Sequence, residues 1–169
     1  MSHVLVFGAG RVARPCVQSL LKDPSTRVTV ADVDESNLSR VLENHPRGEG
    51  VVADAGKEAE DLIRKTNPDL VINLLPAAFM YPVAKLCVEM KKPMVNPSYI
   101  KDDMKSLDGP AKEAGVTLLC ELGLDPGIDH MSAARTVRRI REAGGQVESF
   151  RSVCGALPSA EANTNPWGY

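Results

Sequence analysis

A short glycine-containing stretch near the start of the chain, Gly8-Ala9-Gly10-Arg11-Val12-Ala13, carries residue types suited to holding a phosphate group. It matches the pattern G-x-G-x-x-A, follows an apolar run at residues 4–7 and precedes a helical pattern. Gly8 permits a tight turn, Gly10 lets a pyrophosphate approach the backbone, and Ala13 lets the helix pack closely on a sheet. Amide groups at the helix start attract the phosphate charge. The stretch predicts a dinucleotide site contacted by Gly8, Gly10, Arg11, Val12 and Ala13; a tight turn without a ligand is the alternative.

A carboxylate stands where such a site holds the ribose. Asp32 follows the second apolar run, about 20 residues after the glycine turn, which is the usual spacing. A carboxylate there accepts hydrogen bonds from the ribose hydroxyls and repels a 2′-phosphate, so NAD is the predicted cofactor. Two alternatives stay open. Asp32 and Asp34 are also suited to capping the next helix, and Arg11 and Arg40 are able to neutralise a 2′-phosphate, which would admit NADP.

Polar residues also end three later apolar runs. Asp54 follows residues 50–53, Asn73-Leu74-Leu75-Pro76 ends the fourth run, and Asn96-Pro97-Ser98-Tyr99 follows the fifth. In open α/β sheets, ligands lie across the carboxyl ends of the strands. We therefore predict cofactor contacts from Asp54, Asn73, Leu74 and Leu75. A helix cap at Asp54 and a hydrogen-bonded core side chain at Asn73 are the alternatives.

The most distinctive stretch is Glu121-Leu122-Gly123-Leu124-Asp125-Pro126-Gly127-Ile128-Asp129-His130-Met131. Pro126 and Gly127 predict a turn that leads into a helix. Three carboxylates in nine residues are unfavourable unless they are solvated, paired or facing a cationic ligand. From the residues alone, Asp125 facing a substrate ammonium group and Asp129 capping the following helix are balanced interpretations.

The elements that must position these residues alternate between short apolar runs and longer helical patterns. Strands are expected at residues 4–7, 28–31, 50–53, 70–75, 94–95 and 116–120, with helices between them, the last over 101–114. This alternation predicts an α/β fold with a Rossmann-type, doubly wound parallel sheet.

The regular alternation ends after residue 120. A helix is expected at 130–143 and a strand at 146–153. We predict an NAD(P)-binding Rossmann domain at residues 1–126, and a connecting helix with the first strand of an incomplete substrate domain at 127–169. Because a lone strand has no partner, pairing with a second chain in a homo-oligomer is an alternative.

The bulk composition narrows the class of partner. The chain has 43% hydrophobic and 25% charged residues and a net charge of −2, which is typical of globular domains and argues against nucleic-acid or anionic-membrane binding. No apolar stretch is long enough to span a membrane. The widely spaced cysteines form no zinc motif or disulfide framework; they are Cys16, Cys87, Cys120 and Cys154. We predict no metal and a cytoplasmic location, or the mitochondrial matrix if a presequence has been removed.

Three segments together resemble one known family. Residues 121–131, the stretch Val95-Asn96-Pro97-Ser98-Tyr99-Ile100 before them and residues 152–169 after them closely resemble the saccharopine dehydrogenase family of the glutamate-forming type. The resemblance covers residues 4–169. It implies an NAD(P)-dependent oxidoreductase of lysine metabolism that oxidises the C–N bond of saccharopine. Water then splits the imine into glutamate and 2-aminoadipate 6-semialdehyde, and some members run in reverse.

The resemblance also implies roles for individual residues and a small-molecule amino-acid substrate as partner. The residues implied to bind saccharopine are Ser98, Tyr99, Asp125 and Cys154, and those implied to flank the nicotinamide are Leu124 and Pro126. Asp125 combines charge with position, so it is the predicted catalytic residue, which would hold the secondary amine of the substrate. For Cys154, a small buried hydrophobic residue is the alternative.

One departure from the family pattern bears on activity. Family members continue well beyond residue 169, and that part is expected to supply arginines for the substrate carboxylates. The arginines at positions 135, 138, 139 and 141 are typical of a solvated helix face instead. Two alternatives therefore remain: a truncated, non-catalytic nucleotide-binding module, and a related amine or amino-acid dehydrogenase such as lysine or carboxynorspermidine dehydrogenase.

Overall fold

The computed structural model describes residues 1–153 and divides the chain into two compact units, Met1–Gly127 and Ile128–Tyr169. Every strand formed by the described residues lies in the first unit. The described part of the second unit contains one helix, α7 (Ile128–Glu142), none of whose residues is buried. Asp129 lies inside the first turn of this helix and not at the position before it.

Six parallel strands form the sheet of the first unit. Their order is β3-β2-β1-β4-β5-β6. The strands are β1 (Ser2–Phe7), β2 (Thr26–Asp32), β3 (Gly48–Val52), β4 (Leu70–Asn73), β5 (Met94–Val95) and β6 (Leu118–Leu119). The strand order reverses between β1 and β4, and this reversal opens a crevice at the carboxyl ends of the strands, where dinucleotides bind. The predicted Rossmann-type, doubly wound sheet is confirmed.

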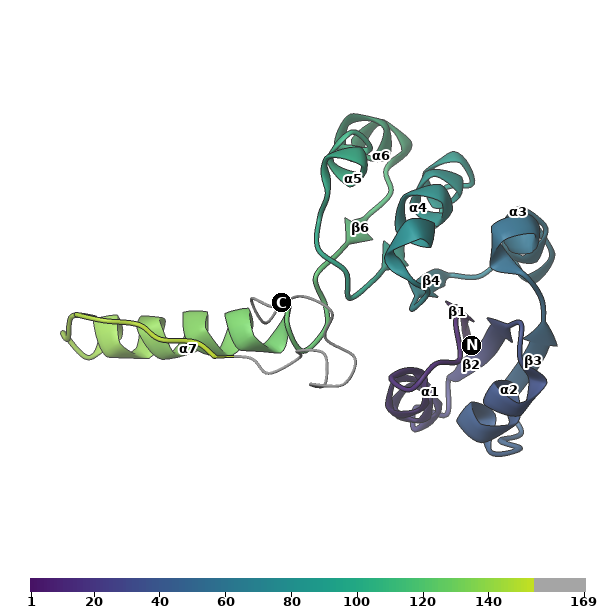
Figure 1. Ribbon diagram of the computed structural model, residues 1–169, viewed down its shortest axis with the longest axis horizontal. Coiled ribbons are helices and arrows are strands. Elements are labelled where there is room, and N and C mark those ends of the chain that lie inside the picture. The colour runs from purple at the N-terminus through teal and green to yellow at the C-terminus, as the bar shows by residue number, and fades with distance from the viewer. Residues whose placement is uncertain (154–169) are drawn as a thin grey trace, which may run out of the picture. The chain divides into compact units, whose positions relative to one another are not determined.

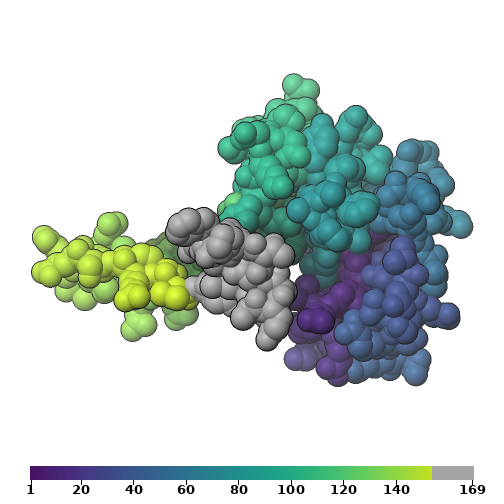
Figure 2. Space-filling view, viewed as in Figure 1, coloured from purple at the N-terminus to yellow at the C-terminus, as the bar shows by residue number. Residues whose placement is uncertain are grey.

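Helices cover both faces of this sheet (Figure 1). They are α1 (Ala13–Leu21), α2 (Glu35–Leu42), α3 (Ala55–Thr66), a short 3-10 turn η1 (Ala77–Phe79), α4 (Met80–Glu89), α5 (Asp102–Lys105) and α6 (Asp108–Ala114). Side chains alternate across a strand, so Val4 and Val6 of β1 pack with α1 and α2, whereas Leu5 and Phe7 pack with α3 and α4. Figure 2 shows the first unit, coloured purple to teal, as closely packed side chains.

The structure differs from the sequence-based expectation in two segments. The helix expected over residues 101–114 is divided into α5 and α6, with Ser106 and Leu107 between them. Pro110 explains the division, because proline inside a continuous helix lacks an amide hydrogen and collides with the preceding turn. Residues 146–153, which are described, form no strand; a strand needs a partner with which to share hydrogen bonds. Among the described residues, no helix has the length and apolar character needed to cross a membrane.

Candidate cofactor and substrate site

The glycine turn closes tightly over the end of β1. Gly8 has a φ of +96°, and a Cβ atom there would lie 3.1 Å from the carbonyl carbon and oxygen of Leu74. Its amide donates to the carbonyl oxygen of Ala31 at 2.8 Å, and the amide of Leu74 donates to that of Phe7, also at 2.8 Å. Gly8 is therefore required by the protein itself, because it lies between β2 and β4.

Gly10, by contrast, faces open space. A Cβ atom added there would meet no other atom within 4 Å. The residue before α1, Val12, is 64% exposed and supplies no side-chain hydrogen bond to the first helical turn. An uncapped helix start with open space beside it fits an anionic group. The geometry of Gly10, Val12 and the fully buried Ala13 thus suits the pyrophosphate of a dinucleotide.

The two carboxylates after β2 have different partners. Asp32 accepts hydrogen bonds from the amide of Ala9 at 2.6 Å and from the amide of Asp34 at 2.9 Å. Asp34 caps α2, since it accepts from the amide of Ser36 at 2.8 Å and from its hydroxyl at 2.6 Å. These hydrogen bonds from Ser36 lower the pKa of Asp34. Asp34 is therefore the helix cap, whereas Asp32 lies against the glycine turn.

The residues predicted at the ends of β3 and β4 serve the local structure. Asp54 caps α3 by accepting from the amide of Gly56 at 2.9 Å. Asn73 is fully buried; its amide nitrogen donates to the carbonyl of Phe79 at 3.2 Å, and its oxygen accepts from the amide of Leu75 at 3.2 Å. Asn73 thus orders the chain between β4 and η1. Direct contacts of Asp54, Asn73 and residues 74–75 with a cofactor stay predictions.

Four of the residues predicted near the substrate or nicotinamide line one cavity. Its volume is about 290 Å³. The phenolic hydroxyl of Tyr99 donates to a carboxylate oxygen of Asp125 at 2.9 Å. The lining residues are Ala77, Met80, Pro97, Ser98, Tyr99, Lys101, Asp103, Met104, Asp125 and Pro126. Leu124 is 70% exposed, and Cys154 lies outside the described residues. The loops after β5 and β6 therefore bring Ser98, Tyr99 and Asp125 together at the carboxyl edge.

Two residues that the sequence analysis did not assign to the site join these loops. Asn96 is buried; its oxygen accepts from the amide of Ser98 at 2.9 Å, and its nitrogen contacts the sulfur of Cys120 at 3.2 Å. Glu121 has a φ of +61°, and its carboxylate accepts from the amide of Ile100 at 3.1 Å. The signal for both was their place at strand ends, but only the fold shows which amides they bind.

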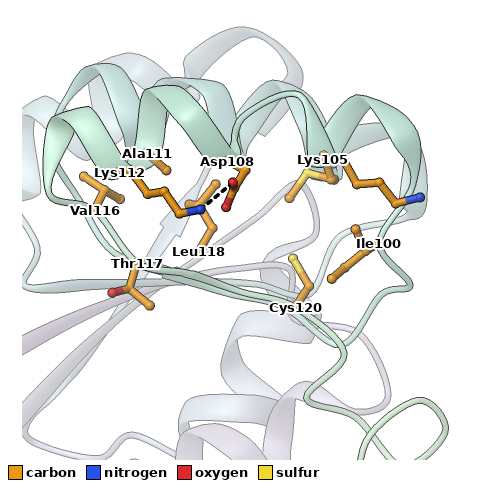
Figure 3. A pocket seen from close by; sticks show the side chains of 10 residues that line it. Ile100, Lys105, Asp108, Ala111, Lys112, Val116, Thr117, Leu118 and Cys120 are labelled. Carbon is orange, nitrogen blue, oxygen red and sulfur yellow. Dashed lines mark hydrogen bonds and ion pairs between the residues drawn. The ribbon is translucent and has the colours of Figure 1, made fainter.

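A second cavity, of about 560 Å³, lies between β6 and the helices α5 and α6 (Figure 3). None of the sequence-predicted site residues lines it. Burial raises the pKa of the Cys120 thiol on its wall, so this sulfur is a weak nucleophile at neutral pH. The ammonium group of Lys112 pairs with Asp108 at 2.7 Å. This cavity shares one lining residue, Met104, with the cavity at the carboxyl edge.

Family models match the chain in two parts. Residues 4–119 match the saccharopine dehydrogenase NADP binding domain, and residues 123–169 match the saccharopine dehydrogenase C-terminal domain. The chain belongs to the saccharopine dehydrogenase family. The resemblance inferred from the motifs is thereby confirmed, as is the presence of an NAD(P)-binding domain.

Individual relatives agree with this assignment. The chain is 40% identical to the mitochondrial alpha-aminoadipic semialdehyde synthase of Bos taurus, over 98% of this chain and 18% of that protein. It is 37% identical to saccharopine dehydrogenase (NADP(+), L-glutamate-forming) of Pyricularia oryzae, over 98% of this chain and 37% of that protein. The chain thus spans well under half the length of these curated relatives.

A solved structure of the family confirms the fold. Apo saccharopine dehydrogenase (L-Glu forming) from Saccharomyces cerevisiae superposes with a TM-score of 0.81 at 33% identity, covering 100% of this chain and 38% of that one. A WlbA dehydrogenase from a Chromobacterium, at 18% identity and a TM-score of 0.64, shares the fold. The predicted cytoplasmic location stays a prediction, and pairing with a second chain stays an alternative.

Proposed function

We propose that the chain is the cofactor-binding part of an oxidoreductase that interconverts saccharopine with glutamate and 2-aminoadipate 6-semialdehyde. The observation that carries this proposal is the Tyr99–Asp125 hydrogen bond in a cavity at the carboxyl edge of a dinucleotide-binding sheet. Residues 1–126 would form the NAD(P)-binding domain, and residues 127–169 would begin the substrate domain. The family membership and the names of the relatives support the same reaction.

In this proposal, the residues of the chain act mainly by positioning. A bound nicotinamide supplies the hydride acceptor for oxidation of the C–N bond. Asp125 holds the secondary amine of the substrate through an ion pair, and the hydroxyl of Tyr99 keeps its carboxylate in one orientation. Ser98 offers a hydroxyl from the same cavity wall. Leu124 and Pro126 would flank the nicotinamide, and holding the two reacting carbon atoms close together accelerates the transfer.

For the cofactor, we propose NAD in preference to NADP. The negative charge of Asp32 beside the glycine turn supports this choice, because a carboxylate repels a 2′-phosphate. The fungal relatives are named for NADP(+), so the preference needs a direct measurement. Calorimetric titration of the chain with NADH and with NADPH should show tighter binding of NADH. Asp32→Asn should reduce the difference by about tenfold, which corresponds to one lost charge interaction. An unchanged difference would assign the preference to other residues.

Saccharopine is then titrated into the chain with the tighter cofactor bound. A binding response that Asp125→Asn lowers by about tenfold or more supports the proposal. A response to lysine in place of saccharopine would favour the related amine dehydrogenases. Failure of both NADH and NADPH to bind would refute the assignment as a whole.

The second candidate function is a nucleotide-binding module without turnover. The glycine turn favours it, because the backbone suited to a pyrophosphate is fixed by hydrogen bonds to Ala31 and Asp32 of β2. Binding of NADH without any response to saccharopine would support this candidate.

A further inference from the structure

Two side chains of opposite charge hold the backbone of Ala9 in the glycine turn. Its amide donates to Asp32 at 2.6 Å, and its carbonyl oxygen accepts from a guanidinium nitrogen of Arg40 at 3.0 Å. The same nitrogen of Arg40 donates to the side-chain oxygen of Asn37 at 2.8 Å, one turn earlier in α2. The side chain of Ala9 is fully buried, so the residue is held on three sides.

The hydrogen bond from Arg40 also determines the direction of the Gly10 amide. The Ala9 carbonyl and the Gly10 amide belong to the same peptide group, which is planar and trans. When Arg40 holds the carbonyl oxygen, the amide hydrogen of Gly10 must point the opposite way, away from α2. Gly10 borders open space, and its amide belongs to the turn that is suited to a pyrophosphate.

We propose that Arg40 is a positioning residue for dinucleotide binding, which acts by orienting the Ala9–Gly10 peptide. The ligand class is a phosphate-bearing dinucleotide, NADH or NADPH. The inference rests on the nucleotide-binding role of the turn and is independent of which substrate the proposed function assigns. Arg40 lies outside the turn, in α2. Its guanidinium group reaches the carbonyl oxygen of Ala9, which lies 31 positions earlier in the sequence.

A different role for Arg40 makes a different prediction. An arginine near the ribose is able to bind the 2′-phosphate of NADP directly. In that role, its loss would weaken NADPH binding alone. In the positioning role, its loss weakens NADH and NADPH equally, because both cofactors contain the same pyrophosphate.

The test compares Arg40→Ala with Arg40→Lys and the control Arg64→Ala in the full chain. Arg64 is an exposed arginine of α3 that pairs with Glu60, away from the turn. Calorimetry with NADH and NADPH should show that Arg40→Ala weakens both by about five- to tenfold, as for loss of one charge-assisted hydrogen bond. Arg40→Lys, which keeps a charged donor, should recover part of the loss, and Arg64→Ala should bind like wild type.

Thermal unfolding shows whether Arg40→Ala is still folded. If it is not, the nucleotide affinities of Arg40→Lys are compared with those of the wild type instead. Selective loss of NADPH binding would overturn the inference in favour of a 2′-phosphate contact, and so would unchanged affinity for both cofactors. If the wild-type chain binds neither nucleotide, both this inference and the cofactor assignment fail. A missing response to saccharopine would contradict only the proposed reaction.

Discussion

The glycine turn proposed to bind the cofactor and the cavity of Ser98, Tyr99 and Asp125 proposed to bind the substrate lie at the same edge of the sheet, but they are built differently. Gly8 and Ala9 are fixed by hydrogen bonds to β2 and to Arg40 of α2, and Ala9 is fully buried. In the substrate cavity, Tyr99 is 58% exposed and the adjacent Leu124 is 70% exposed. In the proposed function, nucleotide binding therefore depends on backbone that is held by the sheet, whereas substrate binding depends on side chains carried by the two joined loops after β5 and β6.

The largest effects should come from substitutions of the two glycines of the turn. One substitution should lower the stability of the fold, and the other should lower the affinity for NADH. Gly8→Ala places a Cβ atom in a crowded position at positive φ, so it should lower the free energy of unfolding by about 1–3 kcal/mol. Gly10→Ala meets no protein atom, so the unliganded chain should unfold at the wild-type temperature. Its added methyl group should nevertheless reduce NADH affinity more than about tenfold.

Thermal unfolding and NADH titration of both variants make this comparison. Wild-type NADH affinity in Gly10→Ala would place the pyrophosphate elsewhere. Equal destabilisation by the two substitutions would contradict the distinction between a glycine that the fold requires and one that the ligand requires.

The substrate loops should respond in the opposite way to the turn. Tyr99→Phe removes the hydrogen bond to Asp125 and should weaken saccharopine binding by about threefold to tenfold, while NADH affinity stays unchanged. Titration of saccharopine into the NADH-bound variant measures the effect. Equal loss of both ligands would show that the loops and the turn form one inseparable site, and unchanged saccharopine binding would remove Tyr99 from the site.

Glu121 offers a smaller test of how the loops are joined. Glu121→Ala removes the acceptor for the amide of Ile100 and should lower the free energy of unfolding by about 1 kcal/mol. Glu121→Gln keeps a side-chain oxygen and should stay close to wild type. Chemical denaturation gives the stabilities, and hydrogen exchange at Ile100 should be faster in the alanine variant only. Equally slow exchange in both variants would mean that another group holds the loop.

His3 provides the smallest predicted effect, at the end of the sheet away from both sites. Its Nδ1 atom lies 2.9 Å from the carbonyl oxygen of Thr66 and 3.1 Å from a guanidinium nitrogen of Arg27. Its Nε2 atom forms a hydrogen bond with the hydroxyl group of Thr29 at 2.9 Å. Burial and the nearby charge of Arg27 lower the pKa of His3 below its usual 6.5, against opposing effects of the Thr66 carbonyl, Asp69 and Glu49.

The folded state binds the proton of His3 less readily than the unfolded state does. The contribution of neutral His3 to the free energy of unfolding is therefore complete at pH values above the pKa in the unfolded state. It is lost as the pH falls below about 6.5 toward the lower folded pKa. Urea denaturation near pH 7.5 and near pH 5.5 should show lower stability at the acid value. His3→Gln should reduce that difference, and an equal difference in the variant would assign it to other groups.

The sequence was sufficient to predict the features that depend on local pattern. The glycine turn, the apolar runs and the carboxylate at position 32 predict a parallel sheet with its ligand site at the carboxyl edge, and the strand order and the family match confirm the fold. Local signals were insufficient where a distant partner decides the outcome. Residues 146–153 alternate like a strand but form none in the described chain, because alternation alone supplies no partner.

The roles of single polar residues were decided by the tertiary structure. From the sequence, capping of α2 was an alternative role for both Asp32 and Asp34; in the structure Asp34 caps the helix and Asp32 binds the amide of Ala9. Arg40 and Glu121 bind backbone groups 31 and 21 positions away. The spacing of residues along the chain predicts strands, helices and turns, because these depend on the local pattern of apolar and turn-forming residues. Hydrogen bonds between distant residues depend on how the strands are ordered in the sheet, and this order exists only once the chain has folded.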